Sequence, residues 1–446
     1  MRVETDMDDS SVVRTLADAY IWGYPTVDCH SVISRQVLDP ASPDFRAPFN
    51  DFGHARSLAT PEDRAVVALN VDTPYSYLWM DLRAEPIVVT VPAADEGRYV
   101  ALELFDLSTY IVGYVSPRTT GHAGGDFLIA GPSWHGAVPD GIKSAFRVPT
   151  EIAFALCRTQ LFDAADMPNV RRIQDGYRAR PLSACVGSTP PPRPAPFVDV
   201  APVDVRKDKG SVGFFSVLNA MLQYMPPLPE ETAVRQRFAR AGVSAGASFP
   251  ESGGLADAAR TGMSIGLHEM YARAGTIRSS AEIFGSREFL GDDYLSRACG
   301  ALLGIFGNAQ EEYLGVGYQT DAEGELFNGH KRYEIRFEAD DMPPVDAFWS
   351  LTVYTADEFL YANEIDRYVV NSPMVPALTR DAGGSFTLYV QHERPPNDAL
   401  PNWLPVPDGE FGLTFRCYQP RQAILDGAWV APPVTPVGEH APGRKG

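Results

Sequence analysis

The sequence predicts an α+β protein, mainly β, with two β-sandwich (jelly-roll-like) domains that are joined by a helical connector and preceded by an N-terminal helix. Two observations carry this prediction. Short runs rich in β-branched and aromatic residues occur in two separate blocks, with Gly, Pro, Asn and Asp between the runs. Between the blocks, apolar residues recur at spacings of three and four, which is typical of packed helices. Two sandwiches are the simplest way to bury both sets of strands.

The N-terminal segment, residues 1–50, is expected to be helical. Apolar residues from Val12 to Tyr24 recur at helical spacing, and Ser10 or Ser11 can cap the helix. Pro25 removes one helical hydrogen bond, so we expect it to kink or end the first helical segment.

The first β domain is expected over residues 51–187. Its strand-like runs are Val66–Asn70, Pro86–Pro92, Tyr99–Phe105 and Phe127–Gly131. The run from Tyr99 to Phe105 alternates only in part. It therefore fits a strand that is covered on both faces about as well as an edge strand.

Residues 188–320 are expected to form a linker and a helical connector. Ser188–Pro196 is rich in proline, which favours an extended polyproline II segment. Helical spacing follows from Phe214 to Leu222, from Glu230 to Ala241 and from Gly253 to Gly275. Gly262–Gly266 fits the GxSxG pattern, but a nucleophile elbow needs a strand before the turn. A close-packed helix is the expected reading. The second sandwich is expected over residues 321–446, with strands in Arg332–Phe337, Phe348–Tyr354, Ser385–Gln391 and Phe411–Tyr418.

The composition limits the partners of the protein. The chain has 38 Lys and Arg against 57 Asp and Glu, a net charge of −19, and no basic run offsets this charge locally. Nucleic acid and membranes are therefore unfavourable partners. The N-terminus is acidic and no apolar run reaches about 18 residues, so we expect neither a secretory signal nor a membrane span. The five scattered cysteines form no CxxC pair, which is typical of buried thiols in a reducing cytoplasm.

Two sets of motifs carry a family resemblance. The first set is Asn70–Ser76, Trp79–Leu82, Arg98-Tyr99, Arg118–Gly121, Gly131–Gly136 and Arg158–Gln160. The second set is Gly329–Tyr333, Pro343–Ser350, Asn363–Tyr368, Asn402–Pro405 and Leu425–Pro432. They resemble the bacterial family that combines the domains of unknown function numbered 1254, in the N-terminal half, and 1214, in the C-terminal half. The resemblance covers nearly the whole chain.

The resemblance implies an architecture and no agreed reaction. It implies an N-terminal helical piece, a β-sandwich, a helical connector and a jelly-roll-like second sandwich, often assembled as an oligomer, so a homo-oligomer is an open option. The sequence departs from the commoner pattern at Pro74, where Leu is usual, and at His122, where a small polar residue is usual. Many relatives also begin with a secretory signal. These departures leave room for a specialised cytoplasmic task.

The first chemical candidate is the segment from Asp72 to Ser76. Asp72, Thr73, Tyr75 and Ser76 lie in one short loop, so a carboxylate, a phenol and hydroxyls can converge on one point, as proton transfer requires. The alternative is an Asx-turn in which Asp72 caps backbone N–H groups while Tyr75 fills the core.

The second candidate is Arg118 with Thr119, Thr120 and Gly121. A guanidinium fork, hydroxyls and a flexible glycine suit a carboxylate or phosphate on a ligand. The alternative is an internal ion pair of Arg118 with Asp106 or Asp126. His122 follows directly, and its imidazole titrates near neutrality.

A metal site is not expected. His54 matches the family pattern, but the histidines show no HxH or HExxH spacing, and Ala272 stands where the second ligand after His268-Glu269 would be. No GxGxxG or GxxxxGK[ST] loop is present, so we expect no nucleotide and no other cofactor.

Aromatic residues could line an apolar pocket between the domains, although core packing is the commoner use of such residues. The aromatic candidates are Trp22, Tyr24, Trp79, Trp349, Trp403 and Tyr418, and the polar candidates are Arg367, Asn402 and Arg416.

From these residues we predict a cytoplasmic enzyme that acts on a small, partly apolar, anionic metabolite by cofactor-independent acid/base chemistry, as a lyase, isomerase or hydrolase. Asp72 and Tyr75 are the expected acid/base pair, Arg118 orients the anion, and His54 or His122 assists. Two alternatives stay open. One is a non-catalytic ligand-binding or scaffold protein whose Arg and Asp residues form interface ion pairs. The other is a metal-dependent oxygenase, which needs converging His and carboxylate ligands.

Overall fold

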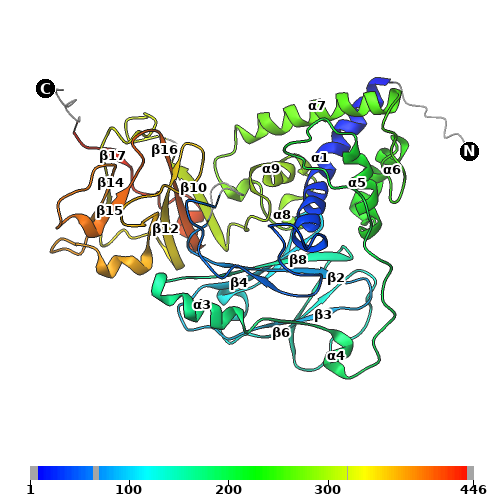
Figure 1. Ribbon diagram of the computed structural model, residues 1–446, viewed down its shortest axis with the longest axis horizontal. Helices are drawn as coiled ribbons and strands as arrows, with labels where there is room; N and C mark the ends of the chain where they lie inside the picture. Colours follow the sequence, from blue (N-terminus) through cyan, green and yellow to red (C-terminus); the bar gives the residue numbers. More distant parts are fainter. Residues whose placement is uncertain (1–8, 64–69, 319, 439–446) are drawn as a thin grey trace, which may run out of the picture.

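The computed structural model of the chain describes residues 9–63, 70–318 and 320–438. Figure 1 shows the second sandwich on the left, the first sandwich below and a body of helices above and to the right. Four mostly antiparallel sheets, a helical region and an N-terminal helix are present, which confirms the predicted fold class.

The first sandwich consists of two sheets with strand orders β1-β2-β8-β4-β5 and β7-β6-β3-β9, in which only β6 and β7 pair in parallel. The strands are β1 Gly53–His54, β2 Tyr75–Asp81, β3 Ile87–Val91, β4 Val100–Asp106, β5 Ile111–Val115, β6 Gly125–Ala130, β7 Ile142–Arg147, β8 Ile152–Thr159 and β9 Arg178–Pro181. Every residue of β4 is buried, so this strand is covered on both faces. The expected strand at Val66–Asn70 falls mainly on residues outside the described part of the chain.

The second sandwich has strand orders β10-β16-β12-β13 and β15-β14-β11-β17. The strands are β10 Tyr313–Tyr318, β11 Tyr333–Phe337, β12 Val345–Thr355, β13 Val369–Asn371, β14 Phe386–Gln391, β15 Trp403–Pro405, β16 Phe411–Pro420 and β17 Thr435–Pro436. Because β10 pairs with β16, the first strand of this sandwich lies upstream of residue 321.

Some of the helices form one body around α1, and the others lie against strands of the two sandwiches. Their bounds are α1 Asp9–Ile33, α2 Pro117–Thr120, α3 Met167–Gln174, α4 Leu182–Val186, α5 Gly213–Met221, α6 Thr232–Arg240, α7 Gly254–Ala274, α8 Arg287–Leu290, α9 Tyr294–Gly304 and α10 Gln422–Leu425. Helix α1 continues through Pro25, so the expectation that Pro25 ends a segment is wrong. Proline costs about one hydrogen bond there, and burial of flanking residues such as Trp22, Tyr24 and Val27 offsets that cost. None of the helices in the described ranges is long and apolar enough to cross a bilayer.

The GxSxG segment lies in the middle of α7, as a packed helix. A Cβ at Gly262 would lie 2.8 Å from the backbone nitrogen of Ala17 and 2.8 Å from the carbonyl oxygen of Val13, and one at Gly266 would lie 3.1 Å from the carbonyl of Ala17. The glycines therefore let α7 approach the backbone of α1 closely.

His30 gives a prediction about acid stability. It lies in α1, is fully buried and stacks on Phe197, and neither ring nitrogen has a hydrogen-bond partner in the described part of the chain. Burial lowers the pKa of His30 from 6.5 to about 4. Between these values the unfolded chain binds more protons than the folded one, so unfolding becomes easier as the pH falls through this window.

We expect His30→Phe to remove this effect. Between about pH 7.5 and pH 5, the wild type should lose about 2 kcal/mol more of its free energy of unfolding than the variant does. Urea unfolding at the two pH values measures the difference. His135→Gln, at an exposed histidine, is the control and should lose as much as the wild type. Equal losses in His30→Phe and the wild type would show that His30 does not titrate in this way.

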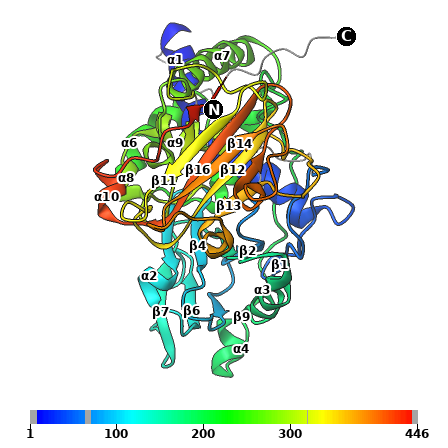
Figure 2. The same cartoon turned by 90° about the vertical axis from the view of Figure 1, so that its left-hand side faces the viewer.

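The helical body covers most of the outer face of the β1-β2-β8-β4-β5 sheet. Trp79, Phe105 and Phe154 of that face belong to the same core as α1, α5, α7 and α9. One end of the face is left to the second sandwich, whose β12 and β16 lie in front of β4 and β2 in the view of Figure 2. This end carries the polar residues that form the candidate site.

Candidate functional site

The two sandwiches meet through the outer faces of two sheets. A small apolar contact marks the junction, made by Tyr99 and Ala101 from the first sandwich with Phe348 and Tyr418 from the second. The rings of Phe348 and Tyr418 stack with their centroids 4.0 Å apart, and the centroid of Tyr99 lies 5.4 Å from that of Tyr418. Around this contact the junction is polar.

Arg416 occupies the centre of the second sandwich's outer face. Its strand neighbours Phe415 and Cys417 belong to the sandwich core, so alternation directs Arg416 to the opposite face. Arg416 is 4% exposed and donates to the hydroxyls of Thr352 (2.7 Å) and Tyr354 (2.6 Å). The guanidinium is thus held in place by two hydroxyl groups of β12.

Tyr313 lies beside Arg416. Gly315 is opposite Arg416 in the β10–β16 register, and a Cβ at Gly315 would lie 2.6 Å from the Tyr313 hydroxyl. Glycine therefore makes room for the phenol. Burial raises the pKa of Tyr313, and the nearby Arg416 opposes this rise.

The loop before β2 brings Asp72 close to Arg416 at the junction. The side chain of Asn70 accepts from the backbone N–H of Asp72 (2.7 Å) and of Thr73 (3.2 Å), and it donates to the hydroxyl of Tyr418 (2.7 Å). The turn is therefore capped by Asn70, and the alternative in which Asp72 is the capping residue is wrong. Asp72 is free to point into the junction because its neighbour takes that role.

The carboxyl of Asp72 is buried, but only one of its two oxygens accepts a hydrogen bond from a described residue. Its side chain is 1% exposed, Oδ2 accepts from Ser350 (2.6 Å), and Oδ1 has no hydrogen-bond partner among the described residues. Burial raises the pKa of Asp72, opposed first by the charge of Arg416 and then by Ser350 and Asn371. The guanidinium of Arg416 therefore acts on this carboxyl through its charge across the junction. Tyr75, half-buried at the start of β2, interacts electrostatically with Tyr313 and Tyr418, as Asp72 does.

The first sandwich adds a buried ion pair. Arg158 of β8 pairs with Glu103 of β4, and it donates to the carbonyl of Phe306 (3.0 Å). Glu103 also accepts from the hydroxyl of Tyr114. Burial raises the pKa of Glu103 to about 7, against the attraction of Arg158. The guanidinium of Arg158 lies 5.4 Å from the ring centroid of Tyr75.

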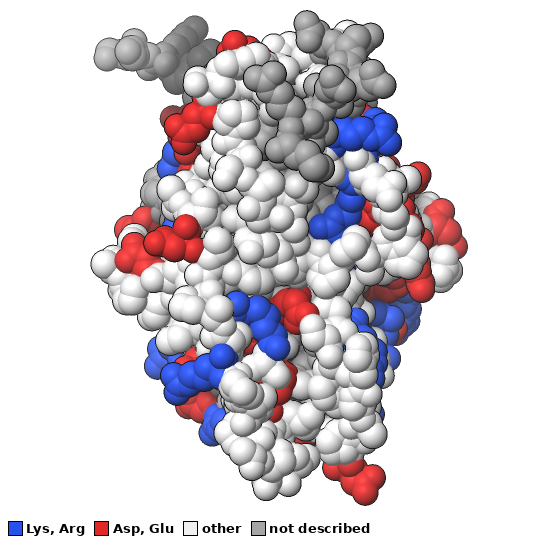
Figure 3. Space-filling view, turned by 90° about the vertical axis from the view of Figure 1, so that its right-hand side faces the viewer, with Lys and Arg blue, Asp and Glu red and all other residues white. Residues whose placement is uncertain are grey.

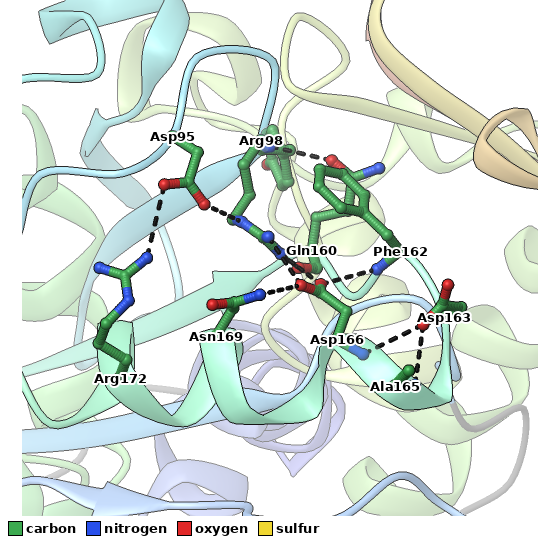
Figure 4. A network of polar contacts seen from close by, with 10 residues as sticks. Asp95, Arg98, Gln160, Phe162, Asp163, Ala165, Asp166, Asn169 and Arg172 are labelled. Carbon is green, nitrogen blue, oxygen red and sulfur yellow. Dashed lines mark hydrogen bonds and ion pairs between the residues drawn. The ribbon is translucent and has the colours of Figure 1, made fainter.

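A second polar network, centred on Arg98 and Asp166, lies near the Arg158–Glu103 pair. Figure 4 shows Arg98 pointing at Asp166; Asp95 accepts a hydrogen bond from Arg98 (3.3 Å) and Asn169 donates one to Asp166 (3.0 Å). Arg98 is 2% exposed and makes two hydrogen bonds to Asp166, of 2.6 and 2.9 Å, which hold the pKa of Asp166 below its usual value. It also donates to the carbonyl of Gln160 (2.8 Å). The ends of β4 and β8 that carry Tyr99 and Arg158 are thereby held together.

A cavity of about 290 Å³ opens at one end of the outer face of the second sandwich. Gly317, Tyr354 and Thr414 are part of its wall, together with the carboxylates Glu358 and Glu410. Since Tyr354 contacts both this cavity and Arg416, the cavity adjoins the polar junction.

Arg118 and Thr119 lie at another edge of the junction. Arg118 is 41% exposed and pairs with the buried Glu312 (2.8 Å). The proposed alternative partners are wrong, because Asp106 pairs with Arg287 and Asp126 with Arg180. The hydroxyl of Thr119 donates to the carbonyl of Tyr114 and caps the short α2. His122 follows α2 in the loop to β6 and lines a small pocket together with Val91 and Val115.

His54 lies on the other side of the sheet from Tyr75. It shares a hydrogen bond with the Ser76 hydroxyl (2.8 Å), and Ser76 points away from Tyr75 because successive strand residues alternate. Burial lowers the pKa of His54 to about 4.

The remaining predicted residues are dispersed. Trp22 and Tyr24 are buried in α1, within the helical body. Arg367 donates to the carbonyls of Leu400, Pro401 and Trp403, and Asn402 bonds the backbone of Thr379 and Thr387. Trp403 is 2% exposed and donates to the carbonyl of Gln391. These contacts satisfy Arg367, Asn402 and Trp403 within the second sandwich. In the described ranges no three His, Cys, Asp or Glu side chains group as metal ligands.

Sequence reasoning missed Glu103, Arg158, Tyr313, Ser350 and Tyr354 as site residues. One signal could have found them. In each of the two sheets that meet at the junction, charged or hydroxyl-bearing residues alternate with core residues along a strand, and aromatic residues stand nearby in the sequence. That pattern marks an outer face, and two such faces predict a domain junction.

The fold and the junction define a class of two-domain protein. In this class two β-sandwiches meet at a buried layer of arginine, carboxylate and tyrosine side chains. Two family models match, each described as a protein of unknown function: DUF1254 at residues 49–181 and DUF1214 at residues 312–422. The chain belongs to the family that combines these two domains in this order.

Two solved structures resemble the chain. The VPA0106 protein from Vibrio parahaemolyticus is 25% identical, with a TM-score of 0.78 over 96% of this chain and 100% of that one. A putative uncharacterized protein from Burkholderia cenocepacia is 14% identical, with a TM-score of 0.44 over 96% of this chain and 93% of the other. No curated protein matches the chain.

Proposed function

We propose that the protein is an enzyme that binds a small organic anion at the junction of the two sandwiches and transfers protons without a cofactor. The observation that carries this proposal is the carboxyl of Asp72, which is buried and lies in the field of Arg416, and whose Oδ1 accepts no hydrogen bond from a described residue. Unsatisfied buried polar atoms are rare in folded proteins and call for an explanation. A substrate group bound next to Asp72 would satisfy this oxygen.

The roles follow from the chemistry of the side chains. Arg416 offers a fixed positive charge that suits a carboxylate on the substrate. Burial raises the pKa of Asp72, so its carboxyl holds a proton to a higher pH than an exposed carboxyl does and can act as a proton-transfer group. The phenol of Tyr313 or Tyr75 is the second proton-transfer group. Arg118 has no anion-binding role, because its guanidinium already pairs with Glu312.

A panel of 2-oxo and 3-oxo carboxylic acids tests the proposal. These acids carry a carboxylate for Arg416 and C–H bonds that exchange under acid/base catalysis. We expect at least one of them to raise the melting temperature of the full chain and to exchange its C–H protons in D₂O, followed by proton NMR. Asp72→Asn should retain the fold, because asparagine can keep the Ser350 hydrogen bond, and should slow exchange by about 10²-fold or more.

Asp340→Asn, at an exposed aspartate, is the control and should exchange at the wild-type rate. An exchange rate in Asp72→Asn equal to that of the wild type would contradict the role of Asp72.

A second candidate function is ligand binding without catalysis. It is favoured by the ion pairs Arg158–Glu103 and Arg118–Glu312, since mutual pairing of these groups suits a structural junction. Acids that bind and show no exchange in the wild type would support this candidate instead.

A further inference from the structure

A second cavity lies in the helical body, apart from the junction of the sandwiches. It has a volume of about 500 Å³, within the range of small-molecule sites. Helix α1 contributes Trp22, the turn after α5 contributes Leu222 and Met225, and α6 contributes Arg235 and Phe238. In Figure 1, α6 lies at the end of the molecule opposite the second sandwich.

The wall of this cavity is mainly apolar and firmly packed. Trp22 and Phe238 are 1% and 2% exposed, and their ring centroids lie 5.7 Å apart. The side of the molecule on which α6 lies carries few charged side chains over its upper centre, with charges to either side (Figure 3). An apolar molecular body fits this environment.

Arg235 is the charged residue in the cavity wall. Its guanidinium lies 5.8 Å from the ring centroid of Trp22, and Nη1 donates to the carbonyl of Met225 (2.8 Å). Arg235 makes no ion pair with any described residue. Glu231, one helical turn away, pairs with Arg287 instead, and Arg287 also binds Asp106.

A second arginine adds positive charge to this region. Arg297 is 2% exposed and donates to the carbonyl of Trp22 (2.5 Å) and to that of Ser108 (2.8 Å), but it contacts no carboxylate among the described residues. Arg235 thus lies near the ring of Trp22 and Arg297 bonds its backbone, and neither arginine has an acidic partner among the described residues. Burial lowers the pKa of Arg235; the charge of Glu231 opposes this effect and that of Arg287 adds to it. A partly buried cation of this kind is stabilised by an anion.

We infer that this cavity binds an amphiphilic monoanion, whose apolar body lies against Trp22 and Phe238 and whose carboxylate pairs with Arg235. The site is separate from the junction at Asp72 and does not depend on the reaction proposed there. It gives Trp22 a binding role within the helical body.

Decanoate is the probe, and isothermal titration calorimetry of the full chain is the measurement. We expect decanoate to bind and decan-1-ol, which lacks the charge, to bind at least tenfold more weakly. Arg235→Gln should weaken decanoate binding by about 10- to 100-fold, as expected for the loss of a charge-assisted pair. Arg240→Gln, at an exposed arginine of the same helix, is the matched control and should change the affinity less than twofold.

A second variant keeps the test decisive if Arg235→Gln does not fold. Ala239 is exposed at the rim of the cavity, so Ala239→Phe should fold and fill the space. We expect it to abolish decanoate binding, whereas Asp72→Asn should bind decanoate as the wild type does. No binding of decanoate to the wild type, equal affinity for decan-1-ol, or unchanged binding in Ala239→Phe would overturn the inference.

Discussion

Replacing Arg158 with methionine is expected to lower the free energy of unfolding by about 3–5 kcal/mol at pH 8.5. Methionine fills a similar space but leaves Glu103 buried without its cation. Glu103 is 0% exposed, and the hydroxyl of Tyr114 is its other hydrogen-bond donor in the described part of the chain. Urea unfolding of the wild type and the variant measures the difference.

The loss of stability in Arg158→Met should become larger as the pH rises. Burial raises the pKa of Glu103 to about 7, and the loss of Arg158 raises it further. Below that pKa the carboxyl binds a proton and no longer needs a cation, so we expect a smaller penalty for Arg158→Met at pH 5.5 than at pH 8.5. The double variant Arg158→Met/Glu103→Gln should recover most of the loss at pH 8.5 and show little pH dependence.

The matched control is Arg394→Met. Arg394 pairs with Glu364 on the surface, where both side chains are about half exposed, so this variant should cost less than about 1 kcal/mol. A penalty for Arg158→Met as small as that of the control would mean that Glu103 is not charged in the folded protein.

Gly262→Val is expected to lower the free energy of unfolding by about 3 kcal/mol. A Cβ at residue 262 would lie 2.8 Å from two backbone atoms of α1, which cannot move without displacing the helix. Thermal unfolding followed by circular dichroism measures the loss. Overpacking is the expected cause, since valine is otherwise a better helix former than glycine.

Gly254→Val serves as the control for this effect. Gly254 starts the same helix, and a Cβ there meets no atom within 4 Å. It should leave the stability nearly unchanged. If both substitutions cost the same, the loss would come from the backbone of α7 and not from its contact with α1.

Much of the fold could be predicted because local signals agree with it. The run Phe411–Tyr418 is rich in aromatic residues and forms most of β16. The course of α1 through Pro25 could not be predicted, since it depends on burial by helices that come far later in the chain.

The site was predicted less completely than the fold. Asp72 and Tyr75 were predicted together because they are close in the sequence, and they remain a prediction. Their partners Ser350, Tyr313 and Arg416 come from strands of the other sandwich, and no local spacing shows that two outer faces will meet. Arg118 was assigned the wrong ion-pair partners for the same reason, because Glu312 lies outside its domain.

The position of α1 has a consequence for the synthesis of the protein. The helices that pack on α1 are α5, α6, α7 and α9, and the whole first sandwich, within residues 34–212, is made before the earliest of them. At roughly 5–20 residues per second, this interval takes on the order of 10–40 s. During that time the apolar surface of α1 is without its final cover, so the growing chain is expected to depend on a chaperone or on the newly folded sandwich to shield it.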